Sequence, residues 1–199
     1  MEGLAVGAEA LLCVVFGVAA SAKLHSRDAL DTFARGLFDL RMLARWAVQP
    51  VAVLVAIIEA AVSVALLVAC LGQLGLPLGA DVAVLGTAAL TVGLGFLCCL
   101  TATIMLALRR GVRAACPCFG RSAVPLGRRH VIRNSGLVSV AVIGIVGHLV
   151  VPSSTPPVGG LLVAVLAGLV LAWPFVFFDE MVGLFAPVDA ADDTTRIRN

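Results

Sequence analysis

The sequence predicts an all-α integral membrane protein, and three observations carry this prediction. Hydrophobic residues make up 61% of the 199 residues and charged residues only 13%, whereas a soluble domain carries about 25% charged residues. Five apolar runs approach or reach the roughly 20 residues that a membrane-spanning helix needs. The positive charges, finally, are confined to alternate connections between these runs. Aromatic residues are few and tyrosine is absent, so we expect no nucleic-acid partner.

The five predicted spans follow one another with short connections. Four runs are long enough on their own: Leu4–Ala22, Val51–Leu71, Val82–Leu108 and Leu161–Phe178. The run Leu137–Val151 becomes long enough if its helix begins near Arg133. Each such helix satisfies its own backbone hydrogen bonds in lipid.

The first run is interpreted as a membrane helix and not as a cleaved signal. Ala20-Ser21-Ala22 is similar to a signal-peptidase site, but Met1-Glu2 supplies no positive charge before the run. The first cation, Lys23, follows the run, which is the opposite polarity to that of a secretory signal.

An amphipathic segment is expected between the first two spans. Ser26 can cap a short helix with Asp28 in its first turn. Apolar residues then recur at helical spacing at Leu30, Phe33, Leu37, Leu40 and Leu43. Such an apolar stripe is usually buried against the rest of the protein. A helix that packs over the mouth of the bundle is therefore favoured over a helix that binds a partner.

The distribution of Lys and Arg predicts the orientation. Five cations fall in or beside the first connection, seven in the third and two at the C-terminal end, whereas residues 72–80 and 152–160 contain none. With five spans, all fourteen lie on one side. By the positive-inside rule, the third connection and the C-terminus are cytoplasmic and the N-terminus lies outside the plasma membrane.

The third connection contains the strongest chemical motif, Cys116-Pro117-Cys118. Arg113 and Arg121 flank it, and nearby positive charge lowers a thiol pKa and so favours the reactive thiolate. Two such thiols can exchange with a disulfide of a partner protein. The alternatives are unremarkable loop thiols or part of a metal site. Since His130 would be only a third ligand where structural zinc takes four, no metal is expected.

Charged and sulfur-containing residues also occur inside the spans. Glu59 lies near the middle of the second span, where a charge costs about 2.5–3.5 kcal/mol, so it should face the bundle interior. Lys23 is its nearest candidate partner, and a direct pair needs helix tilt or a bridging water. Cys13, Cys70, Cys98 and Cys99 are interpreted mainly as packing residues, although Cys98 or Cys99 would also be placed to exchange with a folded-back loop.

Several of these residues together resemble a known family. Phe16–Leu24, Phe33, Pro50 and Glu59 are similar to the helix signatures of DoxX-like membrane proteins. Cys116-x-Cys118-Phe119-Gly120, followed by Leu126-Gly127 and Arg133-Asn134, resembles the MauE branch, the methylamine-utilisation membrane proteins. The resemblance covers about residues 3–150.

This resemblance implies a four-helix membrane bundle over residues 1–151. A fifth transmembrane helix at 152–182 and an acidic, disordered tail at 183–199 are then additions. It implies a role with a thioredoxin-like partner in maturing a disulfide-rich extracytoplasmic amine dehydrogenase subunit. The resemblance gives the redox role to Cys116 and Cys118. It also places Lys23, Glu59 and Arg133 at positions that belong to the family's motifs.

The expected function is that of a membrane thiol–disulfide relay protein, a thiol–disulfide oxidoreductase without a cofactor that supports maturation or redox maintenance of a client. A non-catalytic membrane subunit or assembly factor, in which the cysteine loop only docks, is the alternative. A bundle that binds a quinone or another small molecule around Glu59 is a third hypothesis.

Overall fold

The computed structural model describes residues 2–40, 43–76, 81–111, 127–150, 158–178 and 181, and the secondary structure in these ranges is helical. The helices follow in the order α1 (Glu2–Leu24), α2 (Arg27–Asp39), α3 (Arg45–Gln73), α4 (Val82–Arg109), α5 (Arg128–Val150) and α6 (Val158–Val176). All except α2 are long and apolar enough to cross a membrane. The predicted all-α membrane fold with five spans is therefore confirmed.

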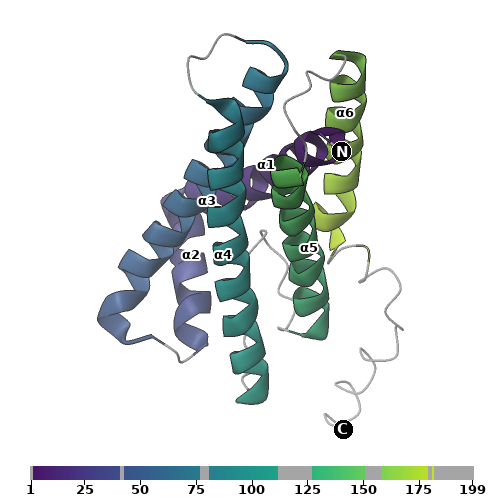
Figure 1. Cartoon of the computed structure of the whole chain (residues 1–199). Coiled ribbons are helices and arrows are strands. Elements are labelled where there is room, and N and C mark those ends of the chain that lie inside the picture. The colour runs from purple at the N-terminus through teal and green to yellow at the C-terminus, as the bar shows by residue number, and fades with distance from the viewer. Residues whose placement is uncertain are drawn as a thin grey trace, which may run out of the picture.

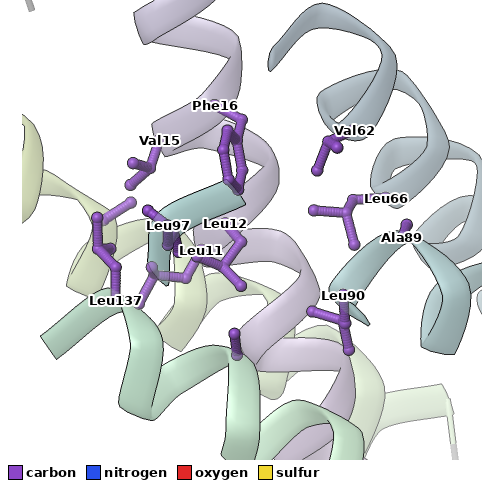
Figure 2. Close-up of a cluster of buried hydrophobic side chains, with 12 residues drawn as sticks. Leu11, Leu12, Val15, Phe16, Val62, Leu66, Ala89, Leu90, Leu97 and Leu137 are labelled. Carbon is purple, nitrogen blue, oxygen red and sulfur yellow. The ribbon is translucent and has the colours of Figure 1, made fainter. Parts of the chain in front are cut away.

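Helix α1 is the centre of the bundle. In its most apolar stretch 61% of the residues are buried, against 17–39% in the other four spans. It packs against α3, α5 and α6, and its residues Leu12 and Phe16 meet Leu66 of α3, Leu90 of α4 and Leu137 of α5 in the main apolar core (Figure 2). The first span is thus an integral part of the fold.

Helix α6 packs along α1 through small side chains. A Cβ atom added to Gly7 would lie 3.1 Å from the carbonyl oxygen of Ala164, and one added to Gly168 would overlap the carbonyl oxygen of Gly7 and approach Cβ of Ala10 to 3.1 Å. Small residues at a helix crossing let the two backbones approach closely in a membrane. Although the sequence pointed to α6 as an addition, it is therefore packed into the bundle, beside the N-terminus (Figure 1).

Helix α2 is the expected amphipathic segment. Its N-cap Ser26 accepts a hydrogen bond from the backbone N–H of Ala29 at 3.1 Å. Phe33 is only 3% exposed and packs with Val48 and Ala52 of α3. The prediction that this stripe is a packing surface is confirmed, because the apolar face of α2 is buried against α3 and α1.

The helix ends that carry Lys and Arg share one end of the bundle. They are the C-termini of α1 and α4 and the N-termini of α3 and α5. Figure 1 shows α1 and α3 inclined to α4 and α5, with the turn between α3 and α4 at the opposite end. The sidedness of this charge is fixed by the fold, whereas the orientation in a membrane stays a prediction. The predicted tail 183–199 lies outside the described residues.

Candidate functional site

A buried ion pair joins α1 and α3. The Lys23 ammonium donates hydrogen bonds to both carboxylate oxygens of Glu59, at 3.0 and 2.8 Å, and to the carbonyl oxygen of Ala19 at 3.1 Å. The two charged side chains are 2% and 5% exposed. The sequence predicted this partner but expected that tilt or a water molecule would be needed. The contact is direct, between helices that pack against each other along much of their length.

Helix α2 supplies a further contact to the pair. The Lys23 Nζ atom lies 4.8 Å from the centre of the Phe33 ring. An ammonium group over an aromatic face is attracted by the ring's negative charge density, by about 2 kcal/mol where water is excluded. The amphipathic helix therefore covers and stabilises the ion pair, in addition to its packing role.

Polar residues of α5 approach the same region. His130, Arg133 and Asn134 are each 4–5% exposed and share one face of the helix, three and four residues apart. The backbone N–H of Gly127 donates to His130 Nδ1 at 3.3 Å, so this imidazole caps the start of α5. From the sequence, His130 was predicted only as a possible third metal ligand, and Asn134 was part only of the family resemblance. The polar face on a membrane helix was the signal that could have found both.

These residues line one cavity of about 450 Å³. Most of its wall is apolar and comes from all five helices α1–α5, and its polar part is formed by Lys23, Glu59, His130, Arg133 and Asn134. We call it the Lys23–Glu59 cavity. It lies toward the cation-rich end of the bundle, because its lining comes from the C-terminal halves of α1 and α4 and the first turns of α5.

The predicted thiol motif is not part of the described residues. Cys116, Cys118, Arg113 and Arg121 all fall between residues 112 and 126. The chain leaves α4 at Gly111, whose φ of 68° is a conformation that glycine adopts without strain. It resumes at Gly127, three residues before His130. The connection thus starts and ends at the cation-rich end, where the Lys23–Glu59 cavity lies.

The cysteines of the spans divide into two kinds. Cys70 is buried and Cys13 is half-buried, as expected for packing residues. Cys98 and Cys99 are free thiols but are exposed, so their interpretation as internal packing residues is wrong. An unbroken run of apolar residues does not reveal which side of a helix faces lipid. Cys99 also lines the Lys23–Glu59 cavity. In the described part of the chain, no cluster of His, Cys, Asp and Glu could hold a metal ion.

A second buried polar cluster lies at the opposite end of the bundle. The carboxylate of Glu9, which is 0% exposed, is 2.7 Å from His148 Nε2 and accepts a hydrogen bond from the Gln73 amide at 2.7 Å. It packs against Gly86, where an added Cβ would overlap it. From the sequence, Glu9 lies near the start of the first predicted span, where hydration is easier than at the middle of the membrane. The structure instead pairs it across three helices.

Comparison with known families decides the identity of this bundle. The family model described as methylamine utilisation protein MauE matches residues 1–147 of the 199. The chain belongs to the MauE family. Comparison with curated proteins and with solved structures finds no match.

The MauE match covers the candidate site described above. It extends from α1 through nearly all of α5, and so includes the ion pair, the Lys23–Glu59 cavity and the Cys-x-Cys connection, whereas α6 lies beyond it. The resemblance seen in the sequence is therefore confirmed for the MauE branch, and the wider one to DoxX-like proteins stays a prediction.

Proposed function

We propose that this MauE-family protein is a membrane thiol–disulfide relay in which Cys116 and Cys118 form the exchanging pair. The observation that carries the proposal is the Cys116-Pro117-Cys118 sequence in the arginine-rich connection between α4 and α5. A disulfide that closes across one residue departs from relaxed geometry, and strained disulfides are more oxidising and more easily reduced. These properties suit transfer better than structural bracing.

The exchange proceeds through a mixed disulfide. One loop thiolate attacks a disulfide sulfur of the partner, forms a new S–S bond and releases the partner's first thiolate. The second loop cysteine then attacks the mixed disulfide, closing the Cys116–Cys118 bridge and releasing the partner's second thiolate. Two electrons and two protons pass from the loop to the partner, and the reverse sequence reduces the loop. Arg113 and Arg121 favour the thiolate that begins each step.

The Lys23–Glu59 cavity supports this proposal through its position. The connection that carries the thiols joins α4 to α5, and both of these helices contribute to the cavity wall. We assign Lys23, Glu59 and Arg133 a supporting role: the Lys23–Glu59 pair joins α1 to α3, and Arg133 lines the same cavity from α5.

The proposed partner is a thioredoxin-like redox protein, and the client is a protein whose disulfides this system forms or maintains. The family description is consistent with an accessory membrane role in amine metabolism. By the positive-inside rule, the exchanging loop and the C-terminus are cytoplasmic and the N-terminus lies outside the plasma membrane. A client outside the cell then requires that reducing equivalents cross the bundle, whereas a cytoplasmic partner is reached directly.

The double variant Cys116→Ser/Cys118→Ser tests the proposal, with Cys13→Ser/Cys70→Ser as the matched control. In cells, the loop variant should abolish client disulfide formation while its abundance stays normal, and the control should act as wild type. Cys118→Ser or Cys116→Ser alone should trap a mixed disulfide with the partner on a non-reducing gel. A loop variant with full client maturation would overturn the relay and favour an assembly factor.

A further inference from the structure

The polar wall of the Lys23–Glu59 cavity presents hydrogen-bond donors beside a buried ion pair. Lys23 already donates to Ala19 and Glu59, and the Arg133 guanidinium, with its several N–H groups, and the Asn134 amide lie on the same wall. These four polar side chains belong to residues that are at most 5% exposed. Hydrogen bonds from charged donors are about twice as strong as neutral ones, and exclusion of water strengthens them further. This wall is built to meet an oxygen-rich, electron-rich group.

The rest of the cavity has the opposite character. Phe16 and Phe96 come from α1 and α4, and Leu37 and Val55 come from α2 and α3. A volume of about 450 Å³ has room for several water molecules, most of them beside apolar side chains that accept no hydrogen bonds. An apolar chain or ring fills such a space more favourably, and the volume falls in the range of small-molecule sites.

We propose that the Lys23–Glu59 cavity binds one amphipathic small molecule. The oxygen atoms of its polar head accept hydrogen bonds from Arg133 and Asn134, beside the Lys23–Glu59 pair, and its apolar body lies between α1, α2 and α4. An isoprenoid quinone, through its carbonyl oxygens, and a free fatty acid, through its carboxylate, both supply this chemistry. The residues that carry this argument all lie on the described helices α1–α5, and the proposal does not depend on the thiol exchange.

Binding of defined probes to the full-length protein tests this site. The protein is placed in phosphatidylcholine nanodiscs, and radiolabelled decyl-benzoquinone or oleate is titrated against it, so that any binding competes with bulk phospholipid. Thr103→Trp fills the cavity, since Thr103 lines it. Thr91→Trp is the matched control: it lies on the same helix and is exposed, and both hydroxyls donate to their own helix, Thr103 to Cys99 and Thr91 to Thr87.

The wild type should bind about one equivalent of at least one probe, Thr103→Trp should weaken it at least tenfold, and Thr91→Trp should stay within twofold. Binding of only the quinone or only oleate identifies the source of the head group. Oleylamine, with the same chain and a cationic head, should bind at least tenfold more weakly than oleate if oleate is bound.

The Cys116→Ser/Cys118→Ser variant should bind as wild type does, so failure of the relay leaves this test intact. Absence of saturable binding by both probes would overturn the proposal. So would an equal loss in the two Trp variants, since filling the cavity would then have no specific effect. Equal binding of oleate and oleylamine would show that the polar wall does not select the head.

Discussion

Removing one partner of the Lys23–Glu59 pair should destabilise the bundle far more than removing both. At 2.8 Å and an effective dielectric constant of about 20, two unit charges attract by about 6 kcal/mol. Much of this offsets the cost of taking both ions out of water. Lys23→Met leaves a carboxylate buried without its cation, and loss of one partner of a buried pair costs about 3–5 kcal/mol. Glu59→Leu should cost somewhat less, because Lys23 ends its helix and can extend toward water.

The double variant Lys23→Met/Glu59→Leu places two apolar side chains in contact and leaves no unpaired charge. Replacement of a buried ion pair by apolar residues is often neutral or stabilising. We therefore expect its free energy of unfolding to lie within about 1 kcal/mol of the wild type. The coupling between the two sites should then be several kcal/mol, which is larger than the values usual for residues in contact.

The assay is reversible unfolding in mixed dodecylmaltoside–SDS micelles, followed by helical circular dichroism, for the wild type, both single variants and the double variant. Asp39→Asn, an exposed acid at the end of α2, is the control and should change stability by less than about 0.5 kcal/mol. Two small, additive single effects would refute the reasoning, since the pair would then be hydrated or absent in the membrane.

Three further predictions follow from other parts of the bundle. Gly168→Leu should overpack the contact with α1, which costs about 1–3 kcal/mol of stability, and should therefore lower the thermal midpoint in detergent. Gly159→Leu, which has open space around it, should leave the midpoint unchanged. His148→Leu should lower the free energy of unfolding by about 1–3 kcal/mol, because it removes a partner of the buried Glu9 carboxylate. His148→Gln, which keeps a hydrogen-bond donor, should lose less stability than His148→Leu. In intact cells an impermeant thiol reagent should label a cysteine introduced at Ser153 and leave the Cys-x-Cys loop unlabelled, and the reverse result would invert the orientation.

Sequence reasoning identified the features that depend on the chain's own chemistry. The spans follow from apolar length, α2 from the spacing of Phe33 and its neighbours, and the Lys23–Glu59 pair from the cost of a mid-membrane carboxylate. Even there the helix ends differed: α3 begins at Arg45 and α5 at Arg128, earlier than the apolar runs, because a helix continues into polar residues once it leaves the membrane.

The contacts between residues of different helices could not be predicted in the same way. Glu9, Gln73 and His148 are far apart in the sequence and each lies close to a predicted membrane surface, so hydration was the simplest expectation for Glu9. Only the inclination of α1 and α3, and the close approach that Gly86 permits, bring the three together. The exposure of Cys98 and Cys99 was missed for a related reason: the position of each residue around a uniformly apolar helix is set by its neighbours.

The position of α1 gives a reason to regard the Lys23–Glu59 pair as functional. Glu9 and Lys23 stand fourteen residues apart on the most buried helix, about 21 Å along its axis. An apolar bundle of this size needs neither charge for stability, because leucine and valine fill the space between them at lower desolvation cost. If Lys23→Met/Glu59→Leu unfolds with wild-type stability but no longer binds the amphipathic probe, the pair contributes recognition and not bracing. If the double variant retains binding, the head of the ligand is held by α5 alone, through Arg133 and Asn134.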